Sequence, residues 1–332
     1  MRKDAFAATA LVAALLISPV LAQDQIDVLI SSGNHVLAGT LTVPAGDGPF
    51  PAVVLVSGSG PSDRDESLPG VALKPFARLA QELASEGVAT LRYDDRGVGK
   101  STGDFLSATS FDFADDARAA LEHLAAGDKI DASRIGFLGH SEGGMIAPHA
   151  AVDNDRVAFV VSLAGTAVTG YDVFATQLRQ ALASLPQADR EAAFAPQIHS
   201  LDLVVAEDWP AVEAMLASEE GATPERVAQG MVYYRGWLHT FVTHDPADDW
   251  RSIEQPVMAL FGGRDVQVSA DLNRPALEAA LEHNPDVTVV TLPTANHLFQ
   301  DAETGAPPEY ATLPDAFVDG LSARIAEWIK AR

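Results

Sequence analysis

A serine between two glycines is the clearest sign of chemistry in this sequence, in the segment Gly139-His140-Ser141-Glu142-Gly143. The segment fits the G-x-S-x-G pattern, in which a sharp strand-to-helix turn holds a serine hydroxyl clear of a sheet. Glycine has no Cβ, so chain segments can pass close to it. The apolar run 135–138 precedes the turn as a strand would, and the small residues of 142–151 follow it as a helix would. We therefore predict that Ser141 is a nucleophile.

A serine hydroxyl needs a general base, and that base needs an acid to orient it. In this arrangement the chain order is serine, acid, histidine, and the last two follow late strands. Asp265 comes just after the apolar run 256–261, and His297 comes just after the run 287–292. Open α/β sheets place ligands at the carboxyl ends of their strands. We predict Asp265 as the acid and His297 as the base; the alternatives are a helix N-cap and a surface-loop histidine.

Five segments in this order make the chain resemble the α/β-hydrolase superfamily, close to bacterial carboxylesterases of the dienelactone-hydrolase-like and serine-aminopeptidase-like type. They are VSGSGPSDRD at 56–65, DDRGVGKS at 94–101, the serine turn at 139–143, FGGRD at 261–265 and NHLFQ at 296–300. The resemblance covers nearly everything after the first two dozen residues. It implies acyl transfer through a covalent intermediate, with no metal and no organic cofactor.

The resemblance also implies an oxyanion hole made by the backbone N–H groups of Ser59 and Glu142. The chain departs from many relatives here, because Ser57-Gly58-Ser59-Gly60 stands where they carry His-Gly or His-Gly-Gly-Gly. A backbone donor can fill this role with either sequence.

Strand and helix patterns alternate along the chain after a leading hairpin at 26–31 and 36–43. This alternation predicts an α/β fold of the α/β-hydrolase type, with a mostly parallel central sheet and helices on both faces. Residues 166–250 interrupt this alternation with several consecutive helical patterns. The stretch is too long for a loop without secondary structure. We expect an inserted helical cap at 166–250, between two parts of the core at 23–165 and 251–332.

An aromatic group occurs late in the expected cap, at Tyr233, Tyr234, Trp237 and Phe241. Such a group commonly forms the core of a cap, but some members could line a substrate pocket. We select Tyr234 and Trp237 as the candidates for pocket residues.

Charge and composition narrow the possible partners. The 46 acidic and 22 basic residues give a formal net charge of −24, which disfavours binding to nucleic acid or to anionic lipid. The chain has no cysteine, so disulfides, thiolate nucleophiles and cysteine-based zinc sites are excluded. The segment GVGKS at 97–101 lacks the first glycine of a phosphate-binding loop, and we expect Arg96 to hold this loop through ion pairs instead.

Residues 1–22 have the layout of a secretory signal peptide: a basic start, an apolar stretch and small residues up to Ala22. We expect cleavage after Ala22, a periplasmic or secreted protein, and no stable membrane insertion once the leader is removed. An uncleaved N-terminal anchor is the alternative.

Three functions are compatible with these residues. The first is a carboxylesterase for small esters with short acyl chains. The second is an aminopeptidase or acyl-peptide hydrolase on the same triad, which would need carboxylates for a peptide amine, such as Glu207-Asp208 or Glu219-Glu220. The third is a non-catalytic binding protein on a hydrolase fold.

Overall fold

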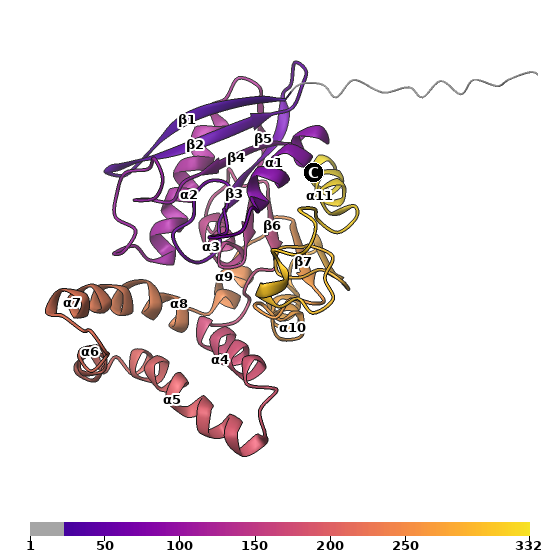
Figure 1. Cartoon of the computed structure of the whole chain (residues 1–332). Helices are drawn as coiled ribbons and strands as arrows, with labels where there is room; N and C mark the ends of the chain where they lie inside the picture. Colours follow the sequence, from indigo (N-terminus) through magenta and orange to yellow (C-terminus); the bar gives the residue numbers. More distant parts are fainter. Residues whose placement is uncertain (1–22) are drawn as a thin grey trace, which may run out of the picture.

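A computed structural model describes residues 23–332 and has an eight-stranded sheet at its centre (Figure 1). The expected signal peptide lies outside the described residues. The strands are β1 (Asp24–Ser32), β2 (His35–Val43), β3 (Phe50–Val56), β4 (Ala89–Tyr93), β5 (Ile130–His140), β6 (Phe159–Leu163), β7 (Val257–Gly262) and β8 (Val287–Leu292). Their order is β1-β2-β4-β3-β5-β6-β7-β8, and β2 is antiparallel to both β1 and β4 while the remaining pairs are parallel. The predicted hairpin and the mostly parallel sheet are confirmed.

Helices cover both faces of this sheet, as the strand-helix alternation predicts. They are α1 (Pro75–Ser85), α2 (Ser110–Ala125), α3 (Gly143–Ala151), α9 (Pro246–Ser252), α10 (Ala270–Ala280) and α11 (Leu321–Lys330). In β3, Val53 and Leu55 pack with α1 and α11, while Val54 and Val56 pack with α2 and α3 on the other face. Side chains of a strand alternate between faces, and burying one of this size stabilises the fold by about 1.5–3 kcal/mol. An apolar run such as β3 therefore binds two helical layers together.

The chain between β6 and β7 forms the inserted cap helices. They are α4 (Gly170–Ala181), α5 (Gln187–Val205), α6 (Trp209–Ala217), α7 (Pro224–Tyr233), the π-helical turn η1 (Tyr234–Leu238) and α8 (His239–Thr243). Figure 1 shows α4 to α8 as a lobe that projects from one end of the core. Threonine or aspartate side chains cap α4, α6 and α7, which explains where these helices begin.

The last helix of the 166–250 stretch, α9, belongs with the core because it packs against α3 and α10. Its Trp250 is fully buried. Among residues 23–332, none of the helices combines the length and apolarity that crossing a bilayer requires.

Candidate active site

Ser141 occupies the tight turn between β5 and α3, with a φ of +55° that side-chain-bearing residues rarely adopt. The two glycines of the motif make this turn possible. A Cβ on Gly139 would lie 1.9 Å from the carbonyl oxygen of Gly143, and one on Gly143 would lie 2.1 Å from that of Val56. The local sequence therefore sets the backbone that presents the serine hydroxyl.

Asp265 and His297 meet beside this turn, although 32 residues separate them in the sequence. The distance from His297 Nδ1 to Asp265 Oδ2 is 2.8 Å, and both residues are buried. The other carboxylate oxygen of Asp265 accepts the backbone N–H groups of Gln267 and Val268, at 2.8 and 2.9 Å. These bonds fix the carboxylate, which in turn orients the imidazole of His297. His297 lines the same cavity as Ser141.

A second histidine-carboxylate pair lines the same cavity as Ser141. His140 Nδ1 is 2.8 Å from Glu66 Oε1, and His140 Nε2 donates to the backbone carbonyl of His297 at 2.9 Å. The burial of His140 acts to lower its pKa, but the Glu66 carboxylate and the carbonyl of His297 outweigh burial and raise the pKa above its usual value. Glu66 and His140 thereby hold the backbone of the loop that carries the base. Nothing in the sequence pattern marks Glu66 for this role.

The loop after β3 lies against the nucleophile, since a Cβ on Gly58 would be 3.0 Å from that of Ser141. The Gly58 N–H donates to Glu66 at 3.0 Å, and the Ser141 N–H donates to the carbonyl of Leu163 at 3.0 Å. Within residues 23–332, the N–H groups of Ser59 and Glu142 donate to no other protein group. These are the two donors predicted from the sequence for an oxyanion hole; Ser59 lines the same cavity as Ser141, and Glu142 follows Ser141 in the chain.

The side chain of Glu142 connects the nucleophile turn to the cap. Its Oε1 accepts hydrogen bonds from Ser110 Oγ at 2.6 Å and from Trp237 Nε1 at 2.8 Å. The carboxylate is 1% exposed, and burial raises its pKa despite these donors. Trp237 is therefore tethered to the residue beside the nucleophile.

A cavity of about 580 Å³ opens over Ser141 and His297. Its cap-side wall is aromatic, because Tyr233, Trp237 and Phe241 stack in sequence with ring centroids 5.3 and 5.0 Å apart. The predicted pocket residue Trp237 lies in this wall. The other, Tyr234, does not line the cavity, and its neighbour Tyr233 does. Tyr233, Trp237 and Phe241 are four residues apart and therefore share one face of the helix. Tyr234 lies off that face and packs against the buried hydrophobic core.

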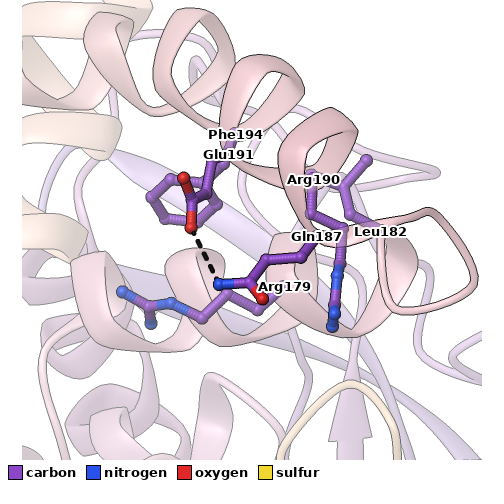
Figure 2. Close-up of a pocket in the computed structure, with 6 residues that line it drawn as sticks. All are labelled: Arg179, Leu182, Gln187, Arg190, Glu191 and Phe194. Atoms are coloured by element: carbon purple, nitrogen blue, oxygen red, sulfur yellow. Dashed lines mark hydrogen bonds between the residues drawn. The ribbon is translucent and has the colours of Figure 1, made fainter.

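A separate cavity of about 560 Å³ lies within the cap, between α4 and α5 (Figure 2). Arg179 stands over the ring of Phe194 at 4.9 Å, and Gln187 donates to Glu191 at 3.3 Å. None of the residues that line this cavity also lines the cavity over Ser141.

Arg96 forms the expected ion pairs. Its guanidinium contacts Asp116 at 2.7 Å and Asp112 at 3.2 Å, and so fastens the 97–101 loop to α2. The cap carboxylates considered for amine binding, Glu207-Asp208 and Glu219-Glu220, are exposed and lie outside the wall of the active-site cavity.

Known proteins resemble this chain in sequence and in fold. The model of the alpha/beta hydrolase family matches residues 53–312. Esterase EstD of Thermotoga maritima is 30% identical over 296 residues, which are 88% of this chain and 65% of the relative, so the chain spans slightly less than two thirds of that protein.

Among solved structures, the esterase Pf2001 of Pyrococcus furiosus superposes with a TM-score of 0.59 at 16% identity, covering 93% of this chain and 91% of the other. A proline iminopeptidase of Mycobacterium smegmatis gives 0.57 at 17% identity, covering 92% and 98%. These structures share the fold with this chain, and the fold accommodates both ester and peptide chemistry.

Proposed function

The chain belongs to the alpha/beta hydrolase family, and we propose that it is a serine carboxylesterase that cleaves small esters with short acyl chains. The observation that carries this proposal is the strained turn at Ser141, which opens into the same cavity as His297, the histidine held by Asp265. The sequence similarity to a protein named as an esterase supports the reaction class.

In the proposed mechanism, His297 Nε2 removes the proton from Ser141 Oγ as that oxygen attacks the ester carbonyl carbon. Asp265 keeps the imidazole oriented and stabilises its protonated form. The N–H groups of Ser59 and Glu142 bind the oxyanion of the tetrahedral intermediate, and each such donor contributes about 3–4 kcal/mol in comparable sites.

Collapse of that intermediate breaks the bond to the leaving alcohol, which takes the proton from His297. An acyl group then remains on Ser141. Water attacks this acyl-enzyme with His297 as the base, the carboxylic acid departs, and the proton returns to Ser141. The cycle draws only on this chain's own residues and water.

The cavity favours small, mostly apolar substrates. Its volume of about 580 Å³ must hold both the acyl and the alcohol group, and its cap-side wall is formed by aromatic rings. The acidic surface, with a formal net charge of −24, disfavours the approach of strongly anionic esters.

An aminopeptidase on the same triad is the competing proposal, and Glu66 is the residue that decides between the two. It is the one carboxylate that lines the active-site cavity in the described part of the chain. Its Oε1 already accepts from Gly58 N–H and contacts His140. Its other oxygen, Oε2, has no hydrogen-bond partner in the described part of the chain but is buried, so a substrate ammonium could reach it only by displacing neighbouring groups, and the arrangement favours esters.

A substrate panel tests the proposal. We expect p-nitrophenyl acetate and butyrate to be hydrolysed with kcat/KM at least 100-fold above aminoacyl-p-nitroanilides. Faster cleavage of the anilides would establish the peptidase, and no turnover of any acyl substrate would favour a binding protein.

A further inference from the structure

A second group of polar side chains lies outside the active-site cavity, where the cap chain returns to the core. His149 is on α3, His244 follows α8, and Asp249 is on α9. His149 Nδ1 is 3.1 Å from Asp249 Oδ1, and His244 Nε2 is 2.6 Å from Asp249 Oδ2. Both imidazoles thus point at one carboxylate, and all three potential ligand atoms lie within 4.8 Å of one another.

The surroundings hold these rings in place. The ring of Phe111 stacks on His149 with centroids 4.5 Å apart and meets His244 edge-on at 5.0 Å. The exposed fractions of the side chains are 28% for His149, 19% for His244 and 11% for Asp249, so solvent reaches the group. The rings are restrained, yet the site is open on one side.

We propose that His149, His244 and Asp249 form a zinc site that braces the junction between the cap and the core. Two imidazole nitrogens and one carboxylate are the ligands that Zn²⁺ takes in many proteins, with water completing a tetrahedron. Hard cations such as Mg²⁺ and Ca²⁺ prefer all-oxygen sites, so the two nitrogens select against them. No metal is predicted from the sequence, because 100 residues separate His149 from Asp249 and no local spacing joins them.

The spacing is compatible with zinc after a small adjustment. Bonds of about 2.0–2.1 Å to zinc place tetrahedral ligand atoms about 3.4 Å apart. The pair His149 Nδ1 and Asp249 Oδ1, at 3.1 Å, is already near this value. His244 Nε2, at 2.6 Å from Oδ2, needs only to turn aside so that the metal replaces its hydrogen bond. Each neutral ring that binds zinc carries its proton on the other nitrogen.

Charge near the site is balanced. Arg118 donates to the backbone carbonyl of His149 at 2.6 Å, so one cation contacts a residue of the site. The same guanidinium pairs with Asp115 at 2.7 Å, and Asp249 itself supplies one negative charge to the metal. The formal net charge of −24 further favours cation binding.

Zinc at this position would join two segments that matter for the cavity. His149 is on the helix that begins just after the nucleophile, and His244 follows the helix that carries Phe241 of the cavity wall. A metal bound to both would resist movement of α8 away from α3. We therefore expect zinc to stabilise the protein and to leave Ser141 chemistry intact.

The test uses the metal itself on the mature protein after treatment with EDTA and buffer exchange. We expect calorimetry to show one Zn²⁺ per chain with a micromolar or lower Kd, and Co²⁺ to give the visible absorption of a four-coordinate nitrogen-oxygen site. At a free zinc concentration of 100 Kd, Tm should rise by a few degrees. Mg²⁺ should produce none of these changes.

Matched variants locate the site. H244N and D249N should weaken Zn²⁺ binding at least 100-fold and abolish the shift in Tm. Their controls are H239N, which changes a half-buried cap histidine 3.6 Å from Glu207, and D248N, which changes the neighbouring carboxylate that pairs with Arg251. Both controls should bind as the unmodified protein does. The proposal is overturned if the unmodified protein binds no Zn²⁺, or if the control substitutions weaken binding as much as the ligand substitutions. Because the first of these results needs no variant, the test does not depend on how the variants fold.

Discussion

Replacing Trp237 with phenylalanine isolates one bond between the cap and the nucleophile turn. The indole N–H donates to Glu142 Oε1 at 2.8 Å, and the two residues are 9% and 1% exposed. Phenylalanine retains an aromatic ring between Tyr233 and Phe241 but has no donor. The substitution therefore removes the hydrogen bond and part of the cavity wall, but leaves an aromatic ring that can stack between Tyr233 and Phe241.

The hydrogen bond contributes about 1–3 kcal/mol, and the upper end of this range applies to an ionised Glu142. Glu142 retains the Ser110 donor, so we do not expect the larger loss that follows when a buried carboxylate has no partner. The smaller ring also enlarges the cavity, and contacts of methylene size discriminate substrates by about 1–3 kcal/mol. A shift of about tenfold in acyl-chain preference follows from the lower end of that range.

Urea unfolding and the kcat/KM values for p-nitrophenyl acetate, butyrate and octanoate measure the two effects. W209F is the matched control, since Trp209 is a half-buried cap tryptophan that does not line the cavity. We expect W237F to lose about 1–3 kcal/mol of unfolding free energy and to shift its preference toward longer esters. A W237F protein that is no less stable than W209F would refute the stabilising role of the Trp237–Glu142 hydrogen bond. A W237F protein that keeps the acyl-chain preference of the unmodified protein would refute the place of Trp237 in the substrate-binding wall.

Three further predictions follow from individual carboxylates and from the leader. D265N should lower kcat by about 10⁴-fold through loss of imidazole orientation, whereas D248N should leave esterase activity within twofold; the reverse result would place the acid elsewhere. Burial raises the pKa of Asp95 to about 8, so the folded protein binds one more proton than the unfolded chain between about pH 4 and pH 8, and stability should fall as pH rises through that window. In urea unfolding at several pH values, the free energy of unfolding should depend less on pH in D95N than in the unmodified protein. The same pH dependence in both proteins would disprove the raised pKa of Asp95. Mass spectrometry of the exported protein should give Gln23 as the first residue, while an intact Met1 would support the anchor.

The proposed triad rests on local patterns in the sequence. Ser141, Asp265 and His297 each follow an apolar strand, and parallel strands bring their carboxyl ends to one edge of the sheet. Glycine is required at 139 and 143 because a Cβ there would clash with the backbone of the turn and of β3. The cap could be recognised in the same way, because helical patterns fill a connection too long to be a loop.

Features that depend on side-chain direction or on long-range contacts could not be predicted. Adjacent tyrosines at 233 and 234 are equivalent in sequence, and only the helix orientation decides that Tyr233 faces the cavity. Glu66 reaches His140 from a loop whose path no periodic pattern fixes. The group around Asp249 assembles from three elements that come together only in the folded chain.

The most direct test of the central claim is to locate the adduct that a fluorophosphonate forms with the mature protein. Peptide mapping by mass spectrometry should place a single phosphonyl group on Ser141, with esterase activity lost in proportion to labelling. S141A, which removes one hydroxyl, should remain folded, take no label and lose at least 10⁴-fold in kcat. An adduct on another residue, or an S141A protein that keeps most of its esterase activity, would contradict the account.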